Sequence, residues 1–176
     1  PLIESVRDAI TAITGSRPTT PIEPVSGGCI HHTFRLGDFF VKTNTADCLP
    51  MFEAEADGLR HIAATHTIRV PQPVVSGRTG PSAFLVLEWL DLGHPGDAAT
   101  LGEQLAALHH HHSPTHGWHR ANHIGSTPQP HPPTPDGIEF LPHHRLGPML
   151  RLLADRGIRL PGADPELPQA CVRRPV

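Results

Sequence analysis

The sequence has no excess of basic residues and no apolar run long enough to cross a membrane. Its formal net charge is −3 over 176 residues, so it lacks the basic surface typical of nucleic-acid-binding proteins. The apolar run FLVL at residues 84–87 is followed directly by Glu88, whereas a membrane-spanning helix needs about 20 apolar residues. Neither a nucleic acid nor a membrane is therefore predicted as a partner.

Cysteine is scarce, and the first residues lack the pattern of a secretion signal. The three cysteines, at positions 29, 48 and 171, form no paired motif, which is typical of free thiols in a reducing compartment. The segment PLIESVRDAI at the start is acidic and lacks the basic-then-apolar order of a signal peptide. These features predict a cytoplasmic protein.

Histidine, by contrast, is concentrated in one segment. LHHHHSPTHGWHRANH at residues 108–123 places seven histidines in sixteen positions, which raises the alternative of a histidine-rich metal-binding protein. A zinc site needs three or four converging ligands, and consecutive helical residues point in directions about 100° apart. Only His109 and His112 could share a helix face, and no cysteine pair or H-E-x-x-H motif completes a set. The favoured interpretation is a helix end that runs into a polar loop, with no metal site.

The hydrophobic pattern changes its period along the chain, which predicts an α+β protein. Helical spacing of apolar residues predicts helices at 3–14, 51–64, 101–110 and 146–160. Alternating, β-branched and aromatic segments predict strands at 22–28, 29–36, 39–43, 70–75 and 82–90. Residues 126–137 include five prolines in twelve positions, and we expect neither regular helix nor strand there.

A glycine turn, a strand lysine and a helix glutamate form the most informative arrangement. Glycines at 27 and 28 allow the backbone N–H groups of the turn to approach a ligand closely. Because successive strand residues point to opposite faces, Lys42 lies on the other face from Val41. We expect it to lie beneath the glycine turn, where it could hold phosphate oxygens. A strand lysine alone is more often a solvated edge residue. Glu55, on the flank of the following helix, is the partner that favours a kinase-like arrangement.

Eight segments follow one another in an order that one known family shares. They are PVSGGCIHHTF, FFVKTN, MFEAEADGL, VPQP, FLVLEWLDLG, LGEQLAALH, GWHRANHIGSTPQP and RLGPMLRL. Together they resemble the bacterial fructosamine kinases, also called ketosamine kinases, over most of the chain. The resemblance implies a protein-kinase-like fold akin to the aminoglycoside phosphotransferases. In that fold an N-lobe, an antiparallel sheet with one packed helix, precedes a helical C-lobe, which is incomplete here.

The resemblance also implies an activity, cofactors and site residues. The activity is ATP-dependent phosphorylation of ketoamine sugar adducts on amines (protein deglycation), with ATP and Mg²⁺ as cofactors. Lys42 matches the lysine on the α- and β-phosphates, and Glu55 matches the glutamate that orients it, with Glu53 as the weaker candidate. The residues that match the nucleotide-covering turn are Ser26, Gly27 and Gly28. The residues that match the hinge, whose backbone would hydrogen-bond adenine, are Glu88, Trp89 and Leu90.

Other positions depart from the family pattern. His31 stands where the family commonly has asparagine, and Ala121 stands where it has aspartate. Near His131, Pro133 and Gly137 the family has asparagine and tryptophan residues that hydrogen-bond and stack, which this sequence lacks. The natural substrate is therefore not predicted from the resemblance.

The sequence contains no His-Gly-Asp segment, which in the family carries the catalytic base and is followed by a metal-binding aspartate. Its one Asp-Pro pair, Asp164-Pro165, precedes the place where that loop should begin. Without a base and Mg²⁺ ligands, phosphoryl transfer loses both proton transfer and charge neutralisation. We therefore expect a truncated or degenerate chain with no catalytic residues of its own. A non-catalytic nucleotide-binding or interaction module is the second hypothesis.

These observations predict three segments. Residues 1–90 form an N-lobe with the nucleotide-binding elements, and residues 91–160 form the hinge and the start of the C-lobe, including a proline-rich substrate-side loop. Residues 161–176 form a frayed tail. The predicted partners of the complete protein are ATP and a glycated amine or ketoamine sugar.

Overall fold

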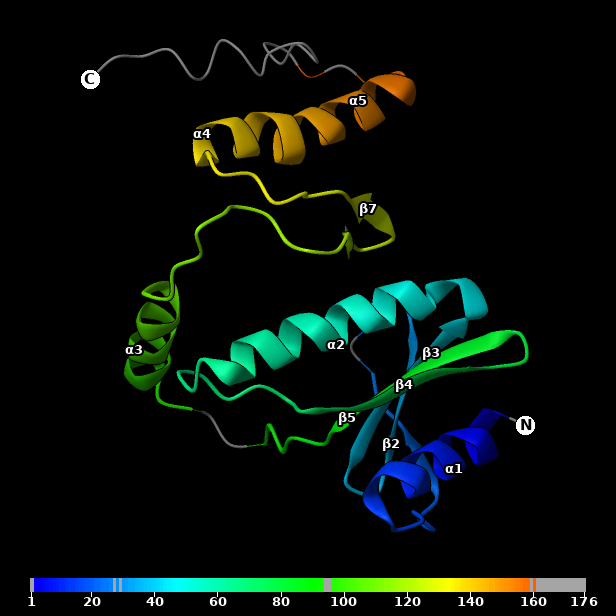
Figure 1. Cartoon of the computed structure of the whole chain (residues 1–176). Helices are drawn as coiled ribbons and strands as arrows, with labels where there is room; N and C mark the ends of the chain where they lie inside the picture. The colour runs from blue at the N-terminus through cyan, green and yellow to red at the C-terminus, as the bar shows by residue number, and fades with distance from the viewer. Residues whose placement is uncertain (1, 27, 29, 94–95, 159, 161–176) are drawn as a thin grey trace. The chain divides into compact units, whose positions relative to one another are not determined.

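The computed structural model of the chain describes residues 2–26, 28, 30–93, 96–158 and 160 (Figure 1). The chain divides into two compact units, Pro1–His111 and His112–Val176. Gly27 of the predicted turn and the predicted tail at 161–176 lie outside the described residues, and the lobe boundary after residue 90 stays a prediction.

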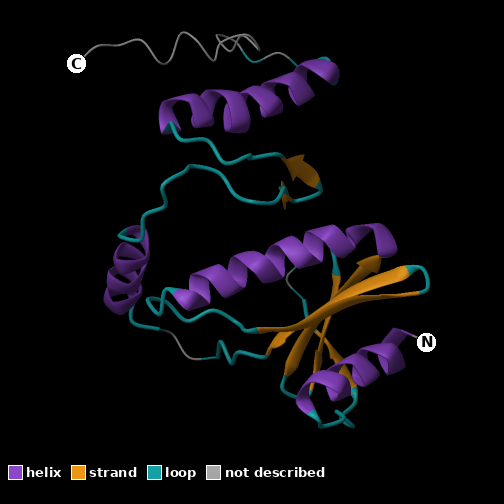
Figure 2. Cartoon of the chain, viewed as in Figure 1, coloured by secondary structure: helices purple, strands orange, loops and turns teal. Residues whose placement is uncertain are grey.

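The first unit is built on a five-stranded antiparallel sheet with the strand order β1-β2-β3-β5-β4 (Figure 2). Its strands are β1 Ile22–Pro24, β2 His32–Leu36, β3 Phe39–Thr45, β4 Pro73–Thr79 and β5 Ser82–Glu88. The tight turn from β2 to β3 depends on Gly37, whose φ of 62° favours glycine. The predicted antiparallel sheet is confirmed.

Two helices cover this sheet, one on each face (Figure 1). Helix α1, Leu2–Thr14, buries Val6 and Ile10 against Phe34 and other apolar residues of one face. Helix α2, Leu49–Ala64, follows a short 3₁₀ turn at Ala46–Cys48 and buries Phe52 against the opposite face.

The prediction of one packed helix was therefore incomplete. All five residues of β5 from Ala83 to Leu87 are buried, although they point alternately to the two faces of the sheet. A strand that is apolar on both faces needs a cover on each side. Helix α1 supplies the second cover.

A glycine in β4 makes room for a buried ring, and its replacement tests this packing. Gly77 pairs with Phe84 across the strands, and a Cβ at Gly77 would lie 2.8 Å from Phe84 Cζ. Because Phe84 is only 3% exposed, its ring has little space to move. We expect Gly77→Ala to lower the free energy of unfolding by about 1–3 kcal/mol in urea titrations.

The matched control for that variant is Gly58→Ala in α2. A Cβ at Gly58 would meet no atom within 4 Å, and alanine favours a helix interior over glycine by about 1 kcal/mol. We expect Gly58→Ala to leave stability unchanged or to raise it. Equal stability of the two alanine variants would contradict the proposed packing of Phe84.

Helix α3, Ala98–His109, begins earlier than predicted. Asp97 caps it, because its carboxylate accepts hydrogen bonds from the N–H groups of Ala99 and Thr100. The Thr100 hydroxyl donates to the same carboxylate, and these hydrogen bonds lower the pKa of Asp97. The helix ends at His109, one residue before the predicted end, and the histidine segment then continues as a loop, as its interpretation predicted.

The second unit contains a two-stranded ribbon followed by helical turns. The strands are β6 Asn122–Ile124 and β7 Thr127–Gln129, and the helical elements are α4 Gly137–Phe140, a π-helical stretch at Leu141–Leu146 and α5 Gly147–Asp155. The prediction of no strand in 126–137 was wrong, since Pro128 pairs with His123 in the ribbon. A strand of a two-stranded ribbon is an edge, where a proline without an N–H is tolerated. The described residues include no helix that is long and apolar enough to cross a bilayer.

Candidate functional site

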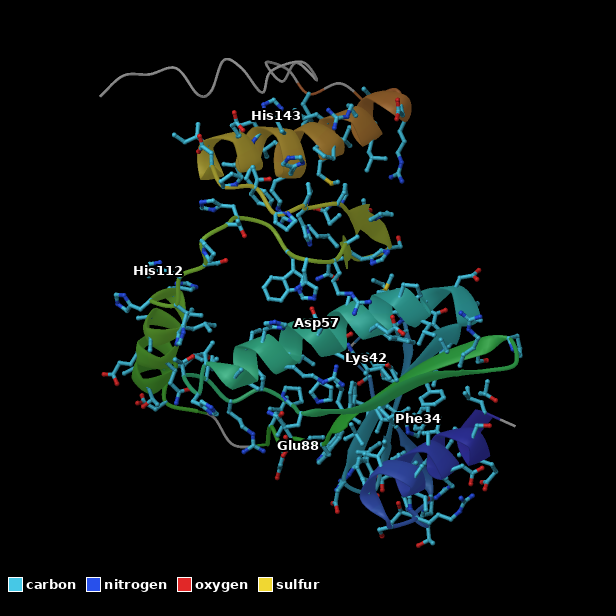
Figure 3. All side chains as sticks on the ribbon, in the orientation of Figure 1. Phe34, Lys42, Asp57, Glu88, His112 and His143 are labelled. Carbon is cyan, nitrogen blue, oxygen red and sulfur yellow. The ribbon has the colours of Figure 1, made fainter. Side chains whose placement is uncertain are left out.

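The strand lysine and the helix glutamate form an ion pair. Lys42 lies on β3 and points toward α2 (Figure 3), where its Nζ is 2.6 Å from Glu55 Oε1. Their side chains are 23% and 29% exposed, so the pair is half-buried and within reach of solvent. The predicted pairing of Lys42 with Glu55 is confirmed. The role of the two residues in binding nucleotide stays a prediction.

Strand and helix periodicity together explain how the pair forms. Phe40, Lys42 and Asn44 alternate along β3 onto the face that α2 covers, since Phe40 packs against the cluster that contains Phe52. On α2, Phe52 and Glu55 are three residues apart and therefore lie on neighbouring positions of one helix face. The apolar contact of Phe52 with the sheet thus brings Glu55 to Lys42.

The ion pair leaves donor capacity on the lysine. A lysine ammonium group has three N–H donors, and one of them is directed at Glu55. The remaining donors can bind an anionic oxygen such as that of a phosphate. Lys42 is also the only lysine in the sequence, so no other ammonium side chain of this chain could take its place.

The turn between β1 and β2 contains the described members of the predicted nucleotide-covering segment, Ser26 and Gly28. The hairpin is closed just before the turn, where Val25 N–H donates to the Thr33 carbonyl at 3.1 Å. The Thr33 hydroxyl donates back to the Val25 carbonyl at 2.7 Å. These bonds fix the point at which the turn leaves the sheet.

The predicted hinge lies at the end of β5. Glu88 N–H donates to the Gln72 carbonyl at 2.8 Å, and Trp89 N–H donates to the Asp38 carbonyl at 2.9 Å. Two of the three hinge N–H groups are thus already engaged by the protein. Among the predicted hinge residues, Leu90 N–H is therefore the remaining candidate donor to an adenine base.

Side chains of the hinge also hold the segment in place. The Glu88 carboxylate pairs with Arg69 and accepts from Gln72 N–H, the latter at 3.3 Å. The Trp89 ring lies 4.7 Å from the Arg35 guanidinium carbon, a cation–π contact. Sequence reasoning missed these contacts, because Arg35 and Arg69 are distant from the hinge along the chain.

A polar cluster in the second unit also escaped the sequence analysis. Gln129 is 2% exposed, and its Oε1 accepts from Arg145 Nη1 at 3.2 Å. The ring of His131 lies with Nδ1 3.5 Å from the same guanidinium. Burial and then the charge of Arg145 lower the pKa of His131. No spacing rule links Arg145 to the proline-rich loop, so this cluster could not be predicted from the sequence.

The histidine segment shows no converged ligand set in the part of the chain that the structure describes. No group of three or more histidine, cysteine, aspartate or glutamate residues there could hold a metal ion. His116 instead stacks on Phe140, with ring centroids 6.3 Å apart. The absence of a specific metal site stays a prediction.

Comparison with known proteins identifies the family. Residues 2–171 match the family model described as fructosamine kinase. The chain belongs to the fructosamine kinase family. Among its relatives, a probable ketoamine kinase of Synechocystis sp. is 44% identical over 144 residues, which cover 78% of this chain and 49% of that protein. The chloroplastic protein-ribulosamine 3-kinase of Arabidopsis thaliana is 40% identical over 162 residues, which cover 87% of this chain and 49% of that protein.

Solved structures confirm the kinase-like fold of the fructosamine kinase family. A protein assigned as a fructosamine-3-kinase from Haemophilus somnus superposes with a TM-score of 0.85 at 24% identity, over 97% of this chain and 60% of that chain. A second one, from Thermobifida fusca, superposes with a TM-score of 0.72 at 31% identity, over 90% of this chain and 57% of that chain. This chain spans about half the length of the sequence relatives it matches.

Proposed function

We propose that the first unit binds ATP for a kinase that phosphorylates ketoamine sugar adducts on amines. The observation that carries this proposal is the half-buried ion pair of Lys42 and Glu55, with Nζ and Oε1 2.6 Å apart. Membership of the fructosamine kinase family and the names of the ketoamine and ribulosamine kinase relatives support the reaction and its substrate class.

In this proposal the ion pair orients a cation for the phosphates. Glu55 accepts one Lys42 proton and so fixes the direction of the ammonium group before ATP arrives. The other two protons donate to phosphate oxygens, whose charge the ammonium stabilises. Because the position of Lys42 is set in advance by β3 and α2, little ordering of the side chain is required on binding.

The adenine base would bind at the end of β5. Leu90 N–H is the proposed donor, because the N–H groups of Glu88 and Trp89 already donate to protein carbonyls. This places the base near Phe39, which pairs with Glu88, and the phosphates near Lys42, three residues further along β3. The turn with Ser26 and Gly28 precedes His32, which pairs with Thr43, so it would cover the phosphates on the side of Lys42 away from the base.

Residues for the transfer step itself are not assigned. The resemblance implies that a His-Gly-Asp segment carries the base and precedes the metal-binding aspartate, and the sequence does not contain that segment. The residues of this chain are therefore proposed to bind and orient ATP only.

ATP titration calorimetry of the 176-residue chain tests the proposed site. We expect Lys42→Met to weaken ATP binding about 10- to 100-fold, because a hydrogen bond to a charged group is lost. Glu55→Gln should weaken it less, since the amide oxygen still accepts from Lys42. The control Arg78→Met removes one exposed positive charge from β4 and should change the affinity less than about twofold. Equal ATP affinity of wild type and Lys42→Met would contradict the proposal.

A further inference from the structure

His31 connects three elements of the first unit at the edge of the proposed ATP site. It directly precedes β2, and its ring packs on that of Phe52 in α2, with centroids 4.7 Å apart and a tilt of 51°. Its Nδ1 lies 3.0 Å from Nδ2 of Asn44, which is on β3. The ring thus touches the strand and the helix that carry Lys42 and Glu55.

The hydrogen bonds of Asn44 determine which nitrogen of His31 carries the proton. Asn44 Oδ1 accepts from Thr45 N–H at 2.8 Å, so its Nδ2 is the donor group. One Nδ2 proton goes to the Ile30 carbonyl at 2.8 Å. The other is directed at His31 Nδ1, which must therefore be an unprotonated acceptor. His31 is then a neutral imidazole with its proton on Nε2.

Electrostatics favour the same neutral form. Burial of the ring and then the positive charge of Lys42 on β3 lower the pKa of His31, while the charge of Glu55 on α2 acts in the opposite direction. A proton on Nδ1 would also set two donors, His31 and Asn44, against each other. The contact between His31 and Asn44 is therefore kept at neutral pH.

The His31 contacts and the ion pair are adjacent bridges between β3 and α2. Asn44 follows Lys42 by two residues on the same face of β3, and Phe52 precedes Glu55 by one helical turn on α2. One bridge is the ion pair itself. The other bridge runs from Asn44 through His31 to Phe52. Asn44 also donates a hydrogen bond to the Ile30 carbonyl, so the same bridge fixes the backbone just before β2.

We propose that His31 is a positioning residue for nucleotide binding, which anchors the start of β2 to Asn44 and Phe52 and so holds β2 and α2 in place around the strand that carries Lys42. This inference rests on the proposed ATP site. A chain in which this anchor is lost spends part of its time in conformations that do not bind nucleotide. The apparent affinity falls by the fraction of competent molecules.

Two variants of His31 and a neighbouring control test the proposal. His31→Ala removes both the ring and the acceptor for Asn44, whereas His31→Asn keeps an acceptor oxygen near the Nδ1 position. The control His32→Ala removes the adjacent histidine, which is exposed and starts β2. We expect His31→Ala to weaken ATP binding about three- to tenfold. His31→Asn should restore most of the affinity, and His32→Ala should match wild type.

Two NMR measurements on the ligand-free chain report the same contact without nucleotide. Long-range ¹H–¹⁵N spectra of the imidazole should show His31 as the neutral form with the proton on Nε2. Because Lys42 is the only lysine, selective labelling of lysine gives one side-chain signal. That signal should move in His31→Ala and stay in place in His32→Ala.

The outcomes separate this inference from the proposed function. Binding that depends on Lys42 but is equal in His31→Ala and His32→Ala would overturn the role of His31 alone. A His31 that is protonated on Nδ1 at neutral pH would also overturn it. An absence of ATP binding in the wild-type chain would overturn the proposed function and this inference together.

Discussion

The purified 176-residue chain should transfer no measurable phosphate from ATP to fructoselysine. General acid–base catalysis contributes about 10²–10⁴-fold to a typical enzyme rate, and electrostatic stabilisation by one preorganised group contributes about 10²–10³-fold. The resemblance to the family implies that a His-Gly-Asp segment supplies the base and precedes a metal-binding aspartate, and the sequence contains no such segment. The expected rate is therefore at least about four powers of ten below that of a complete kinase. Transfer of radiolabelled γ-phosphate to fructoselysine, separated by chromatography, measures it.

The control for this assay is a complete relative, the ketoamine kinase homologue of Synechocystis sp., tested under the same conditions. A trace of contaminating kinase would be removed by repurification and would be insensitive to changes in this chain. Phosphorylation that persists through repurification and disappears in Lys42→Met would show that residues of this chain perform the catalysis. In that case the non-catalytic alternative is excluded as well.

The central pair of the site could be predicted from the sequence because it depends on two local periodicities. Period-2 alternation in β3 placed Lys42 on one sheet face, and the apolar stripe of α2 placed Glu55 beside it. Both rules act over a few residues. The observed Nζ–Oε1 distance of 2.6 Å agrees with that prediction.

The contacts of His31 could not be predicted in the same way. They require residues from the start of β2, from β3 and from α2 to meet, and this depends on the strand register and on how α2 lies over the sheet. Neither is encoded by spacing along the chain. The resemblance implied only that His31 stands where the family commonly has asparagine.

The second covering helix was missed for a related reason. The pattern of α1 predicted an amphipathic helix, but a pattern does not say which surface that helix covers. The missing signal was in β5, whose residues Ala83 to Leu87 are apolar at every position. A strand with two apolar faces requires two covers, and this was a more informative feature than the helix itself.

Affinity labelling of Lys42 should be almost completely blocked by ATP. Lys42 is the only lysine of the chain, so an adenosine derivative with an amine-reactive sulfonyl fluoride in place of the phosphates has one target side chain of this type. If the base binds at the end of β5, the reactive group is delivered to the ammonium paired with Glu55. At a free ATP concentration ten times Kd, the labelling rate should fall about elevenfold, because only the unoccupied fraction reacts.

The most direct test of the central claim, that Lys42 and Glu55 form part of a nucleotide site, is therefore the rate of this labelling with and without ATP. Mass spectrometry of the peptide that contains Lys42 measures it at alkaline pH, with a sulfonyl fluoride that lacks adenosine as the control reagent. We expect fast labelling of Lys42 by the adenosine reagent, protection by ATP, and slow, ATP-insensitive labelling by the control reagent. Labelling of Lys42 at the same rate by both reagents, unchanged by ATP, would contradict the account.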